Sequence, residues 1–250
     1  MEQLGVATVN FVEKIEKLVK AGQVPQLGVQ EILGSTYVSS NWQKIKPASD
    51  AVSLKSLSAF VDFVRTTVDV NSKEFSFPLQ VKVSEFDVTL HSSLDEELDR
   101  NFIAKAVPNN PNIKFDSFMS KEAFIIQLQT CFIETDNKIK LLEMVKYLSD
   151  ESKVETMDDG IGQQVTAQKG VSLRGAINLP PIINLTAYRT YKEVQQVETM
   201  YLLRAKDGGE LALFEADGGM WKYEASLRVS AYLRDALKNE IAKGEVVIIG

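Results

Sequence analysis

The sequence predicts an α+β fold: a mostly antiparallel sheet with a central C-terminal hairpin, covered by several amphipathic helices. Two apolar runs, Leu202-Leu203 and Leu211 to Phe214, flank the segment 206–210, whose Asp-Gly and Gly-Gly pairs favour a tight hairpin turn. Elsewhere, apolar residues alternate over short runs, as in strands, or recur at helical spacing. We expect the hairpin at 198–216 to be covered by the helix from about 220 to 243, whose apolar stripe begins at Trp221.

Residues 1–50 are predicted to be an extension made of a helix and a linker. Apolar residues at nearly heptad spacing continue up to Gly22, which ends the pattern. This helix packs either on its own domain or on a second copy of the chain. The candidate self-association residues are Phe11, Ile15 and Leu18. Residues 34–50 are rich in Ser, Asn and Lys, which indicates a surface connection, and residues 51–250 are expected to form a single α+β domain.

A helix and two strands are predicted next. Ser53 is expected to cap the helix. The apolar stripe of that helix consists of Leu54, Leu57, Phe60, Val61 and Val64. Residues 79–83 and 86–90 both alternate with a period of two, but the phase slips by one residue at Ser84-Glu85. Because such a slip would turn every later side chain to the other face, we expect a bulge or a tight turn there.

A further strand and a pair of helices follow. The strand is predicted from Phe102 to Val107, before the Pro-Asn-Asn-Pro break at 108–111. Ser120 opens one helix and Asp136 caps another, and so few residues separate them that an antiparallel helical hairpin is expected. The two apolar stripes consist of Phe124, Leu128, Cys131 and Phe132, and of Ile139, Leu142, Val145 and Leu148.

Residues 153–175 are predicted to be a polar arm interrupted by glycines. The segment fits either two short strands around Asp158-Asp159-Gly160 or a mobile arm. Its backbone groups need partners, and strand pairing with a neighbouring copy of the chain would supply them. The candidate contacts in this arm are Ile161 and Val165. A strand at 182–190 and a final buried strand at 246–249 complete the domain.

The composition is that of an ordinary soluble globular protein, with 44% hydrophobic and 25% charged residues. We expect no membrane segment and no secretion, since the N-terminus lacks a basic stretch followed by an apolar core. The single cysteine fits a reducing cytoplasm. The formal net charge of −6 disfavours a protein whose main task is to coat nucleic acid, because phosphate binding needs a basic face.

The sequence favours a non-enzymatic protein with no cofactor and no bound metal, although an acidic cluster keeps an enzyme hypothesis open. The one histidine and the one cysteine offer no second partner, and no Walker loop, Rossmann glycine pattern or nucleophile elbow is present. Glu215, Asp217 and Glu224 are the candidate metal ligands, because carboxylates suit Mg²⁺. The structural interpretation is stronger, since Asp217 is placed to cap a helix and Glu224 lies in its first turn.

A second candidate site lies in the segment 188–192. Aromatic residues interleaved with cations stack on and neutralise single-stranded nucleic acid, which makes Tyr188, Arg189, Tyr191 and Lys192 candidate contacts. On a strand, however, these side chains would point to both faces, so we favour a purely structural strand.

Four blocks of sequence resemble the YfdQ-like family, a domain of unknown function found in proteins of tailed phages and prophages. The resemblance extends from about Ser53 to the end, and the most specific block is the ALFEADGG motif at 212–219 followed by Trp221-Lys222. The other blocks are residues 124–129, residues 158–160 with 164–166, and residues 188–190 with 193–194. The resemblance implies a viral protein in the host bacterial cytoplasm, and it brings no reaction and no site residues.

Three functional hypotheses follow. The first is a non-enzymatic phage or prophage accessory protein that self-associates and acts as a binding or assembly protein, with itself and a host or phage protein as partners. The second is a nucleic-acid-associated accessory protein of recombination or replication, based on residues 188–192 and on Lys138, Lys140 and Lys146. The third is a metal-dependent hydrolase that uses the acidic cluster.

Overall fold

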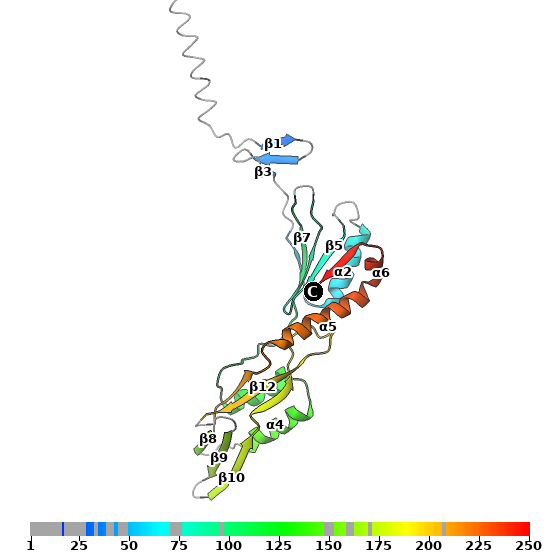
Figure 1. The fold of residues 1–250 in the computed structure, drawn as a ribbon. Helices are drawn as coiled ribbons and strands as arrows, with labels where there is room; N and C mark the ends of the chain where they lie inside the picture. Colours follow the sequence, from blue (N-terminus) through cyan, green and yellow to red (C-terminus); the bar gives the residue numbers. More distant parts are fainter. Residues whose placement is uncertain are drawn as a thin grey trace, which may run out of the picture. The chain divides into compact units, whose positions relative to one another are not determined.

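A computed structural model describes two separate units of the 250-residue chain, residues 1–50 and residues 51–250 (Figure 1). The described residues are Lys17, 29–32, 35–38, 43–44, 50–70, 77–95, 98–147, 153–158, 163–169, 172–206 and 209–250. In the first unit, β1 (Val29–Ile32), β2 (Ser35–Val38) and β3 (Gln43–Lys44) form an antiparallel sheet in that order. These strands were not predicted, because runs of two to four residues are too short to show a clear period.

The second unit is α+β, as predicted, and it contains a five-stranded mixed sheet. The strand order is β14-β5-β6-β7-β4. Strands β5, β6 and β7 are antiparallel to one another in turn, whereas β14 runs parallel to β5 and β4 runs parallel to β7. The strands are β4 (Val52–Leu54), β5 (Leu79–Val83), β6 (Val88–His91), β7 (Phe102–Ala106) and β14 (Val246–Ile249). The turn expected at Ser84-Glu85 is confirmed, because the N–H of Ser84 donates to the carbonyl of Asp87.

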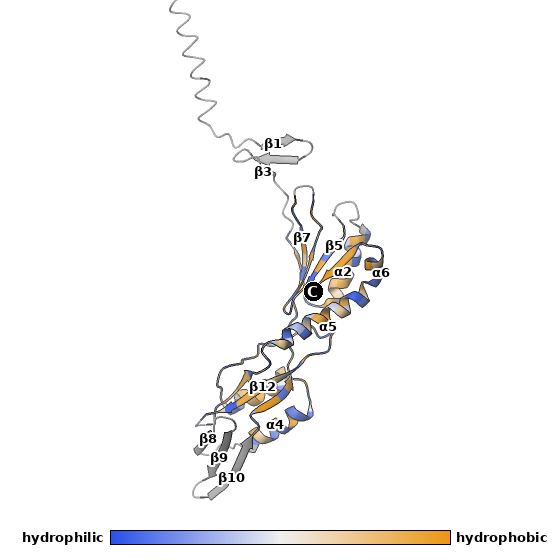
Figure 2. Ribbon diagram, in the orientation of Figure 1, coloured by the Kyte–Doolittle hydropathy of each residue, from blue (hydrophilic) through white to orange (hydrophobic). Residues whose placement is uncertain are grey.

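Three helices accompany this sheet: α2 (Leu57–Val70), α5 (Met220–Ala236) and α6 (Lys238–Ala242). The apolar stripes of α2 and α5 meet the inner face of the sheet in one buried core. That core includes Phe60 and Val64 of α2, Val229 and Leu233 of α5, and Leu79, Val81, Leu90 and Val246 of the strands. Figure 2 agrees with this core, since α5 is polar on only part of its surface and β14 is hydrophobic along its length.

The C-terminal hairpin belongs to a different, three-stranded antiparallel sheet. The order is β11-β12-β13, with bounds β11 (Ile182–Thr186), β12 (Glu198–Ala205) and β13 (Leu211–Glu215). The predicted hairpin is confirmed, with Ala205 opposite Leu211 and a turn that includes Gly209 at φ 81°. Only Gly and a few polar residues adopt such a positive φ readily, which explains the glycine there.

A second core lies between this sheet and the helical hairpin α3 (Lys121–Cys131) and α4 (Asp136–Tyr147). The predicted cover of the hairpin by the helix at 220–243 is therefore wrong. Because β14 pairs with β5, the helix that precedes β14 lies over the five-stranded sheet instead. Only the start of α5 reaches toward β12, where Trp221 and Ala225 pack with Val197.

The predicted arm forms the third sheet of the second unit, made of three antiparallel strands. They are β8 (Lys153–Asp158), β9 (Gln163–Lys169) and β10 (Ser172–Leu179), in the order β10-β9-β8. The strand alternative is thus the correct one, and the last strand continues past residue 175. Strand β9 contacts β12, so the arm is joined to the three-stranded sheet by more than the chain itself.

Helix starts were predicted with mixed success. Ser120 caps α3 as expected, because its side chain accepts a hydrogen bond from the N–H of Ala123. Ser53 does not cap α2, since it lies in β4, and the acceptors there are Ser56 for the N–H of Ala59 and Glu193 for the N–H of Leu57.

The start and the phase of α4 also differ from the sequence prediction. The side chain of Thr135, rather than that of Asp136, accepts the N–H of Lys138. The buried stripe contains Leu141 and Val145, while Ile139 is 43% exposed. The phase is set by contact of the helix with β11, a constraint that helical spacing alone does not contain.

Candidate functional site

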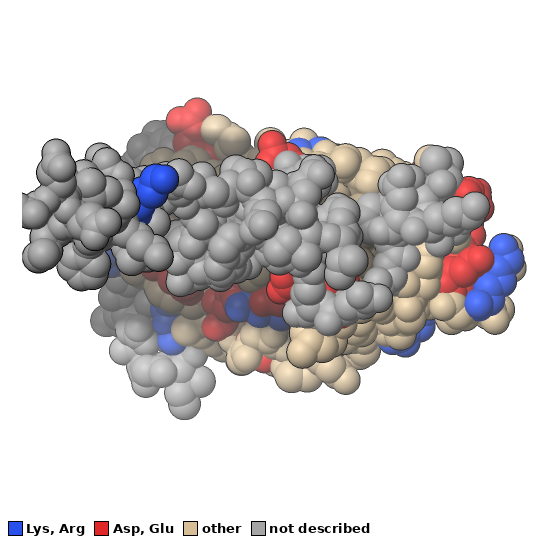
Figure 3. Space-filling model, turned by 90° about the horizontal axis from the view of Figure 1, so that it is seen from above, with Lys and Arg blue, Asp and Glu red and all other residues tan. Residues whose placement is uncertain are grey.

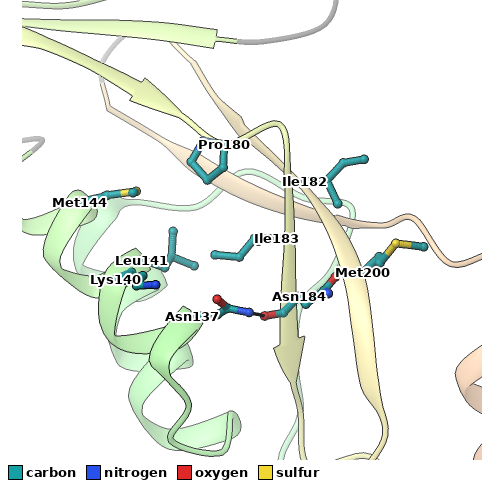
Figure 4. Close-up of a pocket in the computed structure, with 9 residues that line it drawn as sticks. All are labelled: Asn137, Lys140, Leu141, Met144, Pro180, Ile182, Ile183, Asn184 and Met200. Atoms are coloured by element: carbon teal, nitrogen blue, oxygen red, sulfur yellow. Dashed lines mark hydrogen bonds between the residues drawn. The ribbon is translucent and has the colours of Figure 1, made fainter.

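A groove of about 510 Å³ lies between α4 and β11 (Figure 4). Four lining residues come from α4, four precede or belong to β11, and Met200 comes from the neighbouring strand β12. They are Asn137, Lys140, Leu141, Met144, Pro180, Ile182, Ile183, Asn184 and Met200. A volume of this size is within the range of known ligand pockets, and the mostly apolar lining is typical of them.

The groove opens where α4 separates from the edge of β11. At its closed end the side-chain amide of Asn137 donates to the carbonyl of Asn184, at 3.1 Å (Figure 4). One step further along the edge, the N–H of Ile133 donates to the carbonyl of Thr186, at 2.8 Å. Toward Pro180 the helix and the strand have no such bond in the described part of the chain, and the groove occupies the space between them.

The groove exposes backbone groups of an edge strand. Pro181 accepts the N–H of Leu203, which places it in a hydrogen-bonded pair with β12. Because such pairs alternate along antiparallel strands, the N–H and C=O of Ile182 and the N–H of Asn184 point outward. These three groups have no partner among the described residues.

The other edge of the same sheet is covered. Met119 and Leu211 exchange both of their backbone hydrogen bonds, each at 2.9 Å, and the N–H of Asp116 donates to the carbonyl of Leu213. The segment before α3 therefore occupies the edge of β13, where an added strand would otherwise pair. Open edges attract further strands, and here the opening is confined to the start of β11.

The two faces of β11 give the groove two apolar surfaces. Ile183 is buried in the core and points toward Leu141 of α4 in Figure 4. Ile182 lies on the opposite face, 55% exposed, next to Met200, which is 45% exposed. Met144 and Lys140 complete the helical wall, and Lys140 has no ion-pair partner among the described residues.

The segment 188–192 is not a strand, contrary to the sequence prediction, but a loop held by the side chain of Gln196. Its oxygen accepts the N–H groups of Arg189 and Thr190 at 3.0 and 3.1 Å, and its amide donates to the carbonyl of Tyr191 at 2.8 Å. The strand ends earlier, at residue 186, because the chain then pairs with residues 131–133 instead.

Two of the four candidate nucleic-acid contacts already make polar contacts inside the protein. Arg189 is half-buried, pairs with Glu215 and lies over the rings of Phe115 and Trp221, and the hydroxyl of Tyr191 donates to the carbonyl of Ala106 at 2.7 Å. Burial raises the pKa of Tyr191, while Asp87 and Glu193 add to this effect. Tyr188 is half-buried, so Lys192 alone of the four is exposed.

The three lysines of the nucleic-acid hypothesis are also divided. Lys138 is buried, and its ammonium group donates to the carbonyl of Phe132 at 2.7 Å, whereas Lys140 and Lys146 are exposed. On the face drawn in Figure 3, the basic and acidic side chains that are coloured lie near one another rather than in separate fields.

Each carboxylate of the proposed metal cluster has another partner. Glu215 pairs with Arg189, and Glu224 pairs with Arg228 at 3.2 Å. The two oxygens of Asp217 accept the backbone N–H groups of Gly219 and Trp221, each at 3.0 Å, so Asp217 satisfies N–H groups at the helix start, although the N-cap residue is Gly219. No cluster of three potential metal ligands occurs among the residues described.

The remaining titratable candidates also have structural partners. His91 stacks on Phe102 with ring centres 5.1 Å apart, and its ring nitrogen lies 3.1 Å from the hydroxyl of Thr89. Burial lowers the pKa of His91, and the nearby charges of Lys82 and Arg100 lower it further. Cys131, the last residue of α3, is buried in the core, as predicted.

The candidate self-association residues lie mostly outside the described residues. This is so for Phe11, Ile15, Leu18 and Ile161. Val165 lies in β9, opposite Thr156 and Ile177.

The groove was not predicted from the sequence, although a weak signal exists. Pro180-Pro181 directly before a strand indicates an edge, since proline lacks the N–H that a paired strand needs.

Comparison with protein-family models, with curated proteins and with solved structures found no match to this chain. None of the helices in the described ranges has the length and apolarity that crossing a membrane requires.

Proposed function

We propose that this protein acts by binding another polypeptide through the groove between α4 and β11, without chemistry of its own. The observation that carries the proposal is the unpaired start of β11 beside an apolar groove, bounded by Leu141 and Met144 on the helix. Exposed strand edges and apolar grooves are recurrent sites of peptide recognition. The carboxylates, the histidine and the thiol that chemistry would need are already engaged in packing or hydrogen bonds.

The resemblance to the YfdQ-like family supports a setting for this activity. It is based on blocks such as residues 212–219, and it would make the chain an accessory or assembly protein of a tailed phage or prophage in the host cytoplasm. Residues 212–215 of this block lie in β13, and residues 216–219 connect β13 to α5. The side chain of Asp217 in this connection accepts the N–H groups of Gly219 and Trp221.

The nucleic-acid hypothesis is weaker than the polypeptide-binding one. Arg189, Tyr191 and Lys138 make their polar contacts inside the protein. Lys192 and Lys140 are exposed but come from different parts of the chain, and the net charge of −6 opposes phosphate binding.

A selection of short random peptides displayed on a carrier and panned on the full-length chain tests the proposal. Enriched peptides should bind wild type and lose about tenfold in affinity to Met144→Glu, because a buried contact is replaced by a charge. Met220→Glu is the matched control, since Met220 is an exposed methionine on another helix. No enrichment, or equal loss in both variants, would reject the groove as a binding site.

Self-association is the second part of the proposal. The sheet β8-β9-β10 has two outer strands of its own, and β14 is an outer strand of the five-stranded sheet with Val247 and Ile249 exposed. Such edges favour pairing between copies. Light scattering should give an oligomeric mass for the full chain and a smaller mass when residues 155–172 are replaced by a Gly-Ser linker. A monomeric full chain at micromolar concentration would reject self-association.

A further inference from the structure

We infer that the groove takes its polypeptide as an added antiparallel strand on β11, and that it selects three consecutive residues that read, from N- to C-terminus, acidic, apolar, apolar. This inference rests on the proposed polypeptide-binding function and specifies its partner. The occupant is a segment of a different protein in extended conformation.

The backbone of β11 sets the first requirement. Ile182 presents both its N–H and its C=O outward, and neither has a partner among the described residues. In an antiparallel pair, a single residue of the incoming strand satisfies both groups. The outward N–H of Asn184 can donate to the carbonyl of the incoming residue two positions before the central one. The carbonyl of Asn184 already accepts a hydrogen bond from Asn137. The added strand is therefore short, with three hydrogen bonds.

The pairing of the added strand with β11 determines which side of the groove each of its side chains contacts. The residue opposite Ile182 must lie on the same face as Ile182, and there it packs on the side chain of Ile182, which is 55% exposed. Burial of this side chain favours an apolar residue at this central position.

The residues on either side of the central one point to the opposite face, toward α4. In Figure 4, Asn137 lies at Asn184, Lys140 lies beside Leu141, and Met144 lies further toward the Pro180 end of the groove. The neighbour on the Pro180 side thus meets Met144, with Leu141 and Ile183 below, and should be apolar. The neighbour on the Asn184 side meets Lys140, the one charged group in the described lining, and should be Asp or Glu.

Lys140 also makes the expected binding more selective than binding of any exposed apolar segment. A purely apolar groove would accept any exposed apolar segment, whereas an ammonium group at one end of it favours a carboxylate at one position and disfavours a cation there. In Lys140→Glu, the same geometry should prefer Lys or Arg at that position.

Three measurements test the inference with the peptide that the selection enriches most. Its sequence should contain the triplet acidic-apolar-apolar, read from N- to C-terminus. Methylation of the backbone nitrogen of its central residue should weaken binding by about tenfold, since one hydrogen bond to the carbonyl of Ile182 is lost. Methylation of the next backbone nitrogen, which points away from β11, is the matched control and should change affinity little. The amides of Ile182 and Asn184 should exchange with solvent about tenfold more slowly in the complex.

A charge exchange completes the test. Lys140→Glu should bind the acidic peptide about tenfold more weakly and should regain affinity when the peptide's acid is replaced by Lys. Unchanged thermal melting of the variants, expected for exposed or half-buried positions, shows that the fold is intact.

The possible failures are distinct. A peptide that loses affinity to Met144→Glu but tolerates methylation and leaves Ile182 unprotected keeps the groove and rejects strand addition. A peptide insensitive to Met144→Glu, or the absence of any enriched peptide, rejects the proposed function as well. An oligomer of this chain that dissociates in Met144→Glu makes the occupant a second copy and overturns the assignment to a different protein.

Discussion

The guanidinium carbon of Arg189 lies 4.5 Å from the centre of the Trp221 ring and 4.1 Å from that of the Phe115 ring. The cation thus lies over two aromatic rings, and its guanidinium also pairs with Glu215. Phe115 in turn stacks on Tyr201, whose pKa is raised to about 12, chiefly by burial. This cluster ties the loop at 188–196 to the start of α5 and to the three-stranded sheet.

Replacement of Trp221 should therefore act through folding. Trp221→Ala removes the packing with Val197 and Ala225 and one face of the Arg189 site, and should cost roughly 3–5 kcal/mol of unfolding free energy. Urea unfolding provides the measurement. Tyr223→Ala, on the same helix and 60% exposed, is the control and should stay within about 0.5 kcal/mol of wild type. A normal melting curve for Trp221→Ala would contradict the structural role.

Gln196 is expected to be as important as an apolar core residue. It is buried, and Gln196→Leu keeps much of the volume but leaves the N–H groups of Arg189 and Thr190 without their acceptor. Unsatisfied buried groups cost about 1–3 kcal/mol each, so we expect a loss of roughly 2–4 kcal/mol. Gln195→Leu, at an exposed neighbouring position, should have little effect. Equal unfolding free energies for the two variants would show that the loop does not depend on Gln196.

Local signals in the sequence were enough for the hairpin at 198–216 and for the α3 cap at Ser120. These features depend on residues close in sequence, namely the Asp-Gly-Gly turn and a serine three residues before its bonded N–H. The segment 188–190 was wrongly predicted to be a strand, as the continuation of the run that begins at Ile182. Its true conformation is set by a side chain further along the chain and by the aromatic cluster around Arg189.

The groove could not be predicted from the sequence either, because its residues are far apart in the chain. Lys140, Ile182 and Met200 belong to three elements, and only the pairing of β11 with β12 and the packing of α4 bring them together. The phase of α4 was also misjudged, since Leu141 rather than Ile139 faces the sheet. A helix of mixed polarity offers two stripes of similar apolarity, and the contact with β11 decides between them.

A pH dependence of stability below pH 6.5 should come from His91, the single histidine of the chain. Burial first, then the charges of Lys82 and Arg100, lower its pKa from the ordinary 6.5. The unfolded chain therefore binds a proton at a higher pH than the folded one does, so stability falls as the pH drops from about 6.5 toward the folded pKa. His91→Gln should lose this dependence. Urea unfolding across that range, together with the NMR titration of the one imidazole, measures it, and a midpoint at or above 6.5 would contradict it.

The last prediction concerns Lys138, which the sequence grouped with Lys140 and Lys146 as a candidate for phosphate binding. Its ammonium group is buried and donates to the carbonyls of Phe132 and Gln129, at 2.7 and 3.4 Å, at the C-terminal end of α3. A cation there satisfies carbonyls that lack a helical partner and lies at the favourable end of the helix dipole.

Lys138→Met should consequently lower the unfolding free energy by about 1–3 kcal/mol, because the buried carbonyls lose a charged donor while the side-chain volume is kept. Lys140→Met, at an exposed position in the same helix, should change stability by no more than about 0.5 kcal/mol. The two variants thus separate two roles that the sequence does not distinguish. A stable Lys138→Met that binds single-stranded DNA more weakly than wild type, with a reduced salt dependence, would instead place Lys138 on a nucleic-acid surface.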